Sequence, residues 1–144
     1  MPVIFKSSRF GTIELSPERL LHFPLGLIGV PGHAYALILP RPDARFPWLQ
    51  SLHDPGFALP VVDPLLPYPR FELQLAPEDE QLLAGLAGER RVFVTVTARP
   101  RPEESTVNLR APIVIVGQTA FQLLNQAPGA ELRAPLLADA KAAA

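Results

Sequence analysis

No cysteine occurs among the 144 residues of this chain, so disulfides, zinc–thiolate sites and cysteine nucleophiles are excluded. No apolar run approaches the length needed to span a membrane, and the first six residues lack the basic and then apolar pattern of a signal peptide. An excess of positive charge is also missing, since 13 lysine and arginine residues against 14 acidic residues give a net charge of −1. From these absences we expect a soluble, cytoplasmic protein that does not bind nucleic acid directly.

Proline is the residue that the chain holds in excess. Its 18 prolines in 144 residues compare with a typical share of about 5%. Proline lacks an N–H group and is kept out of helix interiors and central strand ladders. The prolines therefore predict a mainly β domain of many short strands, with one or two short helices. We expect this single domain to cover residues 1–136, followed by an alanine-rich tail, 137–144, that frays.

Alternation of apolar and polar residues indicates where the strands lie. Residues 9–15 alternate around Gly11 and suggest a hairpin. Residues 91–98 give the clearest strand, with three valines on one face. Further strands are expected at residues 3–5, 34–39, 46–51, 57–62, 107–109, 112–116 and 121–124.

Residues 77–86 are the best candidate for a helix. Proline and three acidic residues stand at its start, where the helix dipole favours negative charge. Leu82, Leu83 and Leu86 form an apolar face, and Gly85 and Gly88 are plausible stops. Residues 16–19 could open one further helical turn, because serine caps helices and proline suits the first position.

The polar residues do not assemble into a catalytic pattern. His22, His33 and His53 are not spaced as a metal-binding pair on one element, which favours structural or solvent-facing roles. Ser51, His53 and Asp54 are neighbours in sequence, but the members of a catalytic triad meet in space, and no Gly-x-Ser-x-Gly elbow is present. We therefore expect no catalytic residue, no cofactor, no metal and no small-molecule substrate.

Two carboxylates and one charged segment are explained by turns. Asp54 and Asp63 each precede a proline, and an Asx turn, in which the side chain accepts a hydrogen bond from the backbone two residues on, accounts for both. Residues 99–104 read as an exposed loop.

Large amphipathic side chains in loop-like settings remain to be explained. Aromatic residues and arginine are enriched at the hot spots of protein interfaces. We therefore assign a protein-binding surface to Trp48, Gln50, Asn108 and Arg110, although filling of the core is an equally open interpretation for Trp48.

Several motifs, in order along the chain, resemble those of the flagellar assembly factor FliW family. The segment 23–29, Phe-Pro-Leu-Gly-Leu-Ile-Gly, is similar to the family's FPxGLxG loop. Residues 48–51, Trp-Leu-Gln-Ser, and 108–115, Asn-Leu-Arg-Ala-Pro-Ile-Val-Ile, resemble two further family blocks, and Gln122 and Arg133 match later positions. The chain departs from the family at Val30 and Ala130, where aromatic residues are usual, and in residues 116–121, which lack the usual basic residues.

The resemblance implies a fold, a compartment and two partners. It implies a compact antiparallel β-barrel-like domain in the bacterial cytoplasm that binds flagellin and the translational regulator CsrA. By binding CsrA, such a protein relieves the repression of flagellin translation without touching RNA.

Two alternatives stay open at this point. One is a small β-barrel enzyme or cofactor-binding domain that shares only the fold, which would require a concave pocket with convergent polar groups. The other is a related binding module whose partner has changed.

Overall fold

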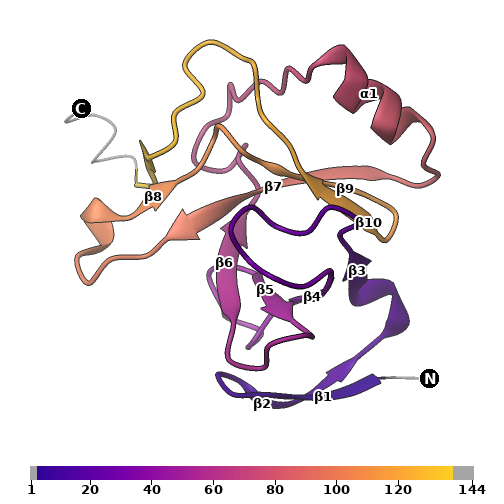
Figure 1. Ribbon diagram of the computed structural model, residues 1–144. Helices are drawn as coiled ribbons and strands as arrows, with labels where there is room; N and C mark the ends of the chain where they lie inside the picture. The colour runs from indigo at the N-terminus through magenta and orange to yellow at the C-terminus, as the bar shows by residue number, and fades with distance from the viewer. Residues whose placement is uncertain (1–2, 138–144) are drawn as a thin grey trace.

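The computed structural model describes residues 3–137 (Figure 1). The expected tail, 137–144, therefore lies outside the described residues except for its first residue. Within residues 3–137, one α-helix, α1 (Pro77–Ala84), and two 3-10 turns, η1 (Pro17–Arg19) and η2 (Pro102–Glu104), accompany eleven strands. The strands are β1 (Val3–Ser7), β2 (Gly11–Leu15), β3 (Leu20–His22), β4 (Ala34–Ile38), β5 (Trp48–Ser51), β6 (Ala58–Val62), β7 (Arg90–Thr97), β8 (Thr106–Val107), β9 (Ile113–Val116), β10 (Thr119–Gln122) and β11 (Ala134–Pro135).

Seven of these strands close into a barrel. Their order is β7-β6-β5-β4-β3-β10-β9, and a second pairing between β9 and β7 completes the ring. The long strand β7 makes this closure possible, because its first half pairs with β9 and its second half with β6. The predicted β-barrel is confirmed. One junction corrects the antiparallel prediction, since β10 and β3 pair in parallel through Thr119 and His22.

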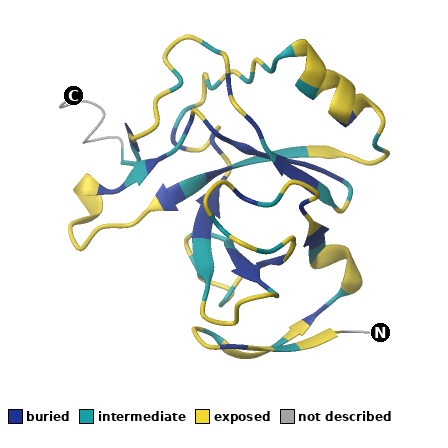
Figure 2. Ribbon diagram, in the orientation of Figure 1, coloured by how far each residue is buried: buried dark blue, intermediate teal, exposed yellow. Residues whose placement is uncertain are grey.

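Side-chain alternation explains why the barrel has both a filled interior and a covered exterior. In β4, Tyr35 and Leu37 point into the interior cluster, whereas Ala36 and Ile38 pack on the outer face. All seven barrel strands contribute to the interior cluster, including Phe93 of β7. Figure 2 shows buried residues concentrated along these central strands.

Helix α1 covers part of the outer face. It begins at Pro77, as predicted, and ends at Ala84, two residues before the predicted end and directly before Gly85, one of the two glycines expected to stop it. Leu83 is 2% exposed and packs with Leu86 against outward-facing residues of β9 and β10. The prediction that Leu82 belongs to the buried apolar face is wrong, because this side chain is 39% exposed. The helix therefore buries a narrower stripe than the leucine pattern suggested.

The β1–β2 hairpin covers a different part of the outer face, at the lower end of the molecule in Figure 1. A hairpin was predicted, but its turn precedes Gly11 instead of including it. The reason is local: Ser7 Oγ accepts hydrogen bonds from the backbone N–H groups of Arg9 and Phe10, both at 3.1 Å. These bonds turn the chain over residues 8–10.

Several strand ends differ from the prediction by one to three residues, and β8 and β11 show the physical reasons most clearly. Strand β8 ends at Val107 and not at residue 109, because Asn108 Oδ1 accepts hydrogen bonds from Arg110 N and Ala111 N. This Asx turn takes the chain out of the sheet. The short edge strand β11 was not predicted, since it contains Pro135, which donates no ladder hydrogen bond.

Candidate functional site

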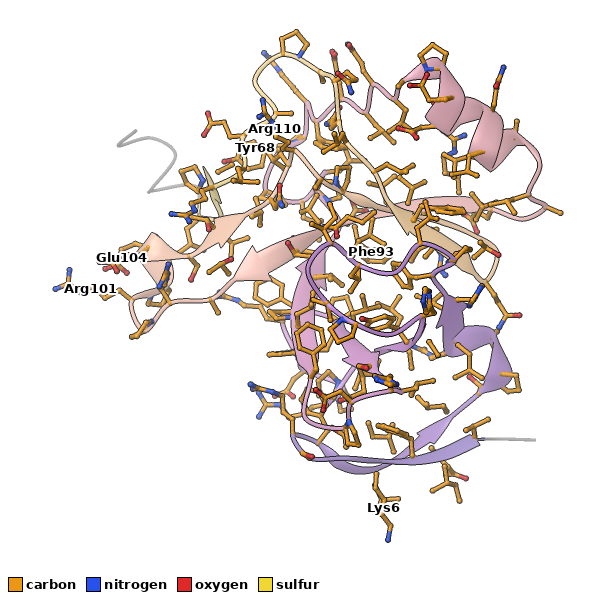
Figure 3. All side chains as sticks on the ribbon, in the orientation of Figure 1. Lys6, Tyr68, Phe93, Arg101, Glu104 and Arg110 are labelled. Atoms are coloured by element: carbon orange, nitrogen blue, oxygen red, sulfur yellow. The ribbon has the colours of Figure 1, made fainter. Side chains whose placement is uncertain are left out.

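The structure separates the four residues assigned to a binding surface into two places. Trp48 and Gln50 lie on β5, while Asn108 and Arg110 lie beyond the end of β8. Figure 3 shows Arg110 in the upper half of the molecule, at the end opposite Lys6 of β1. The binding role of all four residues remains a prediction, but their surroundings differ greatly.

Gln50 is fully buried and acts as a junction between segments. Its Oε1 accepts a hydrogen bond from Ser7 Oγ at 2.7 Å. Its Nε2 donates to Ser51 O at 2.8 Å and to Phe57 O at 3.0 Å, which holds the turn after β5. A side chain with 0% exposure cannot touch a partner while this fold persists. The surface position expected for Gln50 is therefore corrected: it joins the β1–β2 hairpin to the barrel from within.

Trp48 is half-buried beneath that hairpin. Its ring meets Phe10 edge-on, with ring centroids 5.4 Å apart and planes at 75°. The guanidinium carbon of Arg9 lies 4.9 Å from the Trp48 ring centroid, a cation–π contact. The structure therefore gives Trp48 a packing role and leaves it some accessible surface.

Asn108 and Arg110 line a groove of about 430 Å³, which we call the apolar groove. Asn108 is partly buried and its Oδ1 is occupied by the Asx turn, whereas Arg110 is exposed. One wall is residues 95–97 of β7. The rest of the lining is predominantly apolar and comes from distant segments: Leu27, Ile28, Val30, Leu59, Ala111, Gln122, Leu124 and Leu132.

Gln122 holds one wall of the apolar groove in place. Its Oε1 accepts a hydrogen bond from Ile28 N at 2.9 Å, and its Nε2 donates to Ala111 O at 3.0 Å. One side chain thus ties the loop between β3 and β4 to the segment that follows Arg110. The sequence resemblance singles out Gln122 without a role, and the structure supplies one.

Three exposed apolar residues of the apolar groove were missed by sequence reasoning. Ile28 is 66% exposed, Leu124 53% and Leu132 56%. They come from the β3–β4 loop and from two points after β10, and they meet only through the fold. A weak signal existed for Ile28, a large apolar residue in a glycine-rich turn.

The residues weighed for catalysis have structural tasks. Ser51 is fully buried, and its Oγ accepts hydrogen bonds from His53 N at 3.1 Å and Asp54 N at 2.9 Å. The predicted Asx turns are confirmed, since Asp54 Oδ1 accepts from Gly56 N and Asp63 Oδ1 from Leu65 N, both at 2.9 Å. Ser51 is thus an organiser of a turn.

Two of the three histidines, His22 and His33, lie close to each other, although they are eleven residues apart in the sequence. The rings of His22 and His33 lie with centroids 6.3 Å apart, and His33 Nδ1 is 2.7 Å from Phe23 O. Within residues 3–137, no group of three or more histidine, aspartate or glutamate side chains is arranged to hold a metal ion.

A second hollow, of about 580 Å³, lies between the segment 67–72 and the loop 125–131. Two of its polar side chains, Tyr68 and Asn125, form hydrogen bonds within the fold. Tyr68 Oη donates to Pro135 O at 2.7 Å. Asn125 Nδ2 donates to Glu72 O at 2.9 Å, and its Oδ1 accepts from Gln74 N at 3.0 Å. The enzyme alternative requires convergent polar groups that are free to bind a substrate. The polar atoms of Tyr68 and Asn125 are instead used in hydrogen bonds within the fold.

Burial raises the pKa of Tyr68 above its ordinary value of 10.0, and the nearby charge of Glu131 raises it further. Burial also raises the pKa of Tyr35. The folded state therefore favours the neutral phenols, and this contribution to stability is present below pH 10.0 and lost as the pH rises through the folded pKa values. We expect tyrosinate absorbance to appear at higher pH in the folded chain than in urea.

The chain suits this titration because it has only two tyrosines. Tyr68→Phe should remove one of the two titrating groups and leave the other raised. Coincident titration curves for the folded and the unfolded chain would contradict the expected shift.

Comparison with known proteins places the chain in a family. A sequence model of the family described as FliW protein matches residues 4–137. The flagellar assembly factor FliW of Bdellovibrio bacteriovorus is 36% identical over 138 residues, covering 93% of this chain and 79% of that protein. Flagellar assembly factor FliW 2 of Desulfotalea psychrophila is 32% identical over 133 residues, covering 90% and 87%.

A solved structure agrees with the fold. The crystal structure of a flagellar assembly factor FliW superposes with a TM-score of 0.82 and covers 95% of this chain and 99% of that one, at 21% identity. At that identity the likeness shows the fold alone, and the family rests on the sequence matches. With the family model matching residues 4–137, the chain belongs to the FliW family.

Proposed function

We propose that this chain is a cytoplasmic flagellar assembly factor that binds flagellin and the translational regulator CsrA. The observation that carries the proposal is the family match over residues 4–137, together with relatives named flagellar assembly factors. The resemblance in the Trp-Leu-Gln-Ser and Asn-Leu-Arg-Ala-Pro blocks supports the same partners. Binding to CsrA relieves the repression of flagellin translation, so flagellin synthesis follows the amount of free factor.

A mechanism based on binding suits the chemistry of this chain. Its net charge of −1 suits a protein that acts on an RNA-binding regulator instead of on RNA. The described part, residues 3–137, has a single α-helix of eight residues, and no helix there is long and apolar enough to cross a membrane. The apolar groove offers exposed apolar side chains next to an arginine, a combination typical of protein-binding surfaces.

Calorimetric titration with flagellin and CsrA from the same bacterium tests the proposal. We expect each to bind the purified chain with a dissociation constant in the micromolar range or tighter, equivalent to at least about 8 kcal/mol of binding free energy. CsrA bound to the chain should release a flagellin-leader RNA in a gel-shift assay. Binding of neither protein at such concentrations would refute the proposal and favour a module with a changed partner.

A further inference from the structure

Two histidines, His22 and His33, are brought together at the neck of the β3–β4 loop. His22 is the last residue of β3, and His33 directly precedes β4. Their ring centroids lie 6.3 Å apart, with the ring planes at 36°, and both residues are exposed. The sequence alone predicts no such pair, because only the pairing of β3 with β4 closes the distance along the chain. The proposed function makes no use of these two side chains.

The backbone that carries both rings is held in place. His22 N donates to Gln118 O at 2.8 Å, and His22 pairs with Ala34 in the ladder between β3 and β4. Phe23 N donates to His33 O at 2.7 Å, which continues the same pairing beyond the strand ends. The two backbone positions are therefore fixed relative to each other, and rotation of the side chains alone sets the distance between the rings.

A hydrogen bond selects the tautomer of His33. Its Nδ1 lies 2.7 Å from Phe23 O. A carbonyl oxygen only accepts, so Nδ1 carries the hydrogen atom and Nε2 of the neutral ring keeps its lone pair. Histidines that bind metals in proteins are oriented in this way, with one ring nitrogen donating to a carbonyl or carboxylate and the other bound to the ion. His33 is therefore prepared to bind a metal through Nε2.

The distance between the rings suits a single metal ion after a small rotation. Zn–N bonds are about 2.0–2.1 Å long, so the ring centres of two imidazoles on one tetrahedral Zn²⁺ lie about 5 Å apart. The observed 6.3 Å is longer by about 1 Å. Because His22 is exposed, rotation of its side chain can supply this difference. Imidazole nitrogen suits Zn²⁺, Cu²⁺ and Ni²⁺, whereas Mg²⁺ and Ca²⁺ prefer oxygen ligands.

We propose that His22 and His33 together bind one Zn²⁺ ion at the neck of the β3–β4 loop. No group of three or more histidine, aspartate or glutamate side chains in residues 3–137 is arranged to hold a metal ion, so water completes the tetrahedron. Such a site differs from the closed, four-ligand sites of structural zinc. The bound ion links the two ends of the loop 23–32, which contributes Ile28 to the apolar groove.

Asparagine substitutions test the histidine pair. The amide N–H of asparagine takes the place of Nδ1–H, so His33→Asn can keep the hydrogen bond to Phe23 O while it removes the Nε2 ligand. Loss of an outer hydrogen-bond partner alone lowers metal affinity by about 10–100-fold, so loss of a ligand should lower it at least tenfold. We expect this loss for both His22→Asn and His33→Asn in calorimetric titration of the untagged chain with Zn²⁺ at neutral pH.

His53→Asn is the matched control for these substitutions. His53 is the third histidine of the chain and is also exposed. It lies beside the same loop, since a Cβ atom added to Gly32 would come within 3.0 Å of the His53 Cβ atom. His53→Asn leaves both proposed ligands in place and should bind Zn²⁺ with the affinity of the unsubstituted chain.

Two further measurements report on the bound ion directly. Co²⁺ in place of Zn²⁺ should give the visible absorption of a four-coordinate ion in the unsubstituted chain and in His53→Asn only. An ion that binds the folded chain also raises the unfolding temperature by mass action. Zn²⁺ should therefore raise this temperature for the same two proteins, EDTA should reverse the rise, and His22→Asn and His33→Asn should show no rise.

Three results would overturn the assignment. One is an unsubstituted chain that binds no Zn²⁺ at submillimolar concentrations. The second is equal Zn²⁺ affinity in all four proteins, which would place the ion elsewhere. The third is a loss in His53→Asn as large as that in the other two variants. Circular dichroism without metal checks that each variant is folded, and if His33→Asn does not fold, the comparison of His22→Asn with His53→Asn decides.

Discussion

Gly88→Ala should lower the free energy of unfolding by about 2–5 kcal/mol. A Cβ atom at position 88 would lie 2.6 Å from Gly117 N and 2.7 Å from Gly117 Cα, which are backbone atoms that cannot rotate away. Gly88 also has a φ of +134°, a conformation that side-chain-bearing residues rarely adopt. The contact joins the entry to β7 with the β9–β10 turn, so relief of the clash would disturb the strand pair that closes the barrel.

Two matched alanine substitutions separate the causes of this loss. Gly129 has a φ of +80°, and a Cβ atom added there would meet no atom within 4 Å, so Gly129→Ala reports backbone strain alone, at about 1–2 kcal/mol. Gly85, at the end of α1, has a φ of −79° and open space, so Gly85→Ala should be neutral or slightly stabilising. Urea unfolding of the three variants measures the loss in free energy of unfolding, which should be largest for Gly88→Ala and smallest for Gly85→Ala. If Gly88→Ala lowers the free energy of unfolding no more than Gly129→Ala does, the segment at Gly88 and the β9–β10 turn at Gly117 can move apart at little cost, which would contradict the prediction.

The close approach of two turns is the kind of feature that the sequence could not reveal. The sequence indicates only a possible helix stop at Gly88, because the residue that it meets, Gly117, is far along the chain. Local features are predicted better. Proline and acidic residues at the start of α1, the valine alternation in β7 and the Asx turns at Asp54 and Asp63 each depend on neighbours within a few residues.

Closure of the barrel depends on longer distances. The pairing of β7 with β9 and the parallel junction of β3 with β10 leave no local pattern, so only the family resemblance predicts the barrel. The same limit applies to the candidate site. Residue type alone points to Asn108 and Arg110, which do line the apolar groove, but the fold brings the exposed apolar residues beside them. The expected surface position of Gln50 is wrong because residue type favours the surface, while its internal hydrogen-bond partner Ser7 is distant in sequence.

Gln50→Met should lower the free energy of unfolding by about 2–4 kcal/mol. Methionine has a similar length and fits the space, but it makes none of the hydrogen bonds of the amide. The hydroxyl of Ser7 and the carbonyl group of Ser51 would lose their amide partner inside the fold. The carbonyl group of Phe57 would lose the amide as well but would keep its hydrogen bond from Ser51 N at 3.0 Å. Each buried group left without a partner costs about 1–3 kcal/mol, partly offset by relaxation.

Gln118→Met is the matched control for this substitution. Gln118 Nε2 also donates two hydrogen bonds, to Pro17 O at 2.6 Å and to Leu20 O at 3.1 Å, but the residue is exposed. Water can replace the lost donor there, so the loss should stay below about 1 kcal/mol. Thermal or urea unfolding of both variants measures the difference. A similar loss in the two variants would mean that burial of the Gln50 amide adds nothing.

The same variant decides between the two interpretations of Gln50. If the residue acts only inside the fold, Gln50→Met measured well below its unfolding temperature should bind flagellin and CsrA with unchanged affinity. The reason is that the 0% exposed side chain contributes no surface, while the apolar groove and Arg110 lie outside its hydrogen bonds. If Gln50→Met has unchanged stability but no longer binds the partners, Gln50 takes part in binding after all. That result would require the β1–β2 hairpin, which Ser7 ties to Gln50, to open when the partner binds.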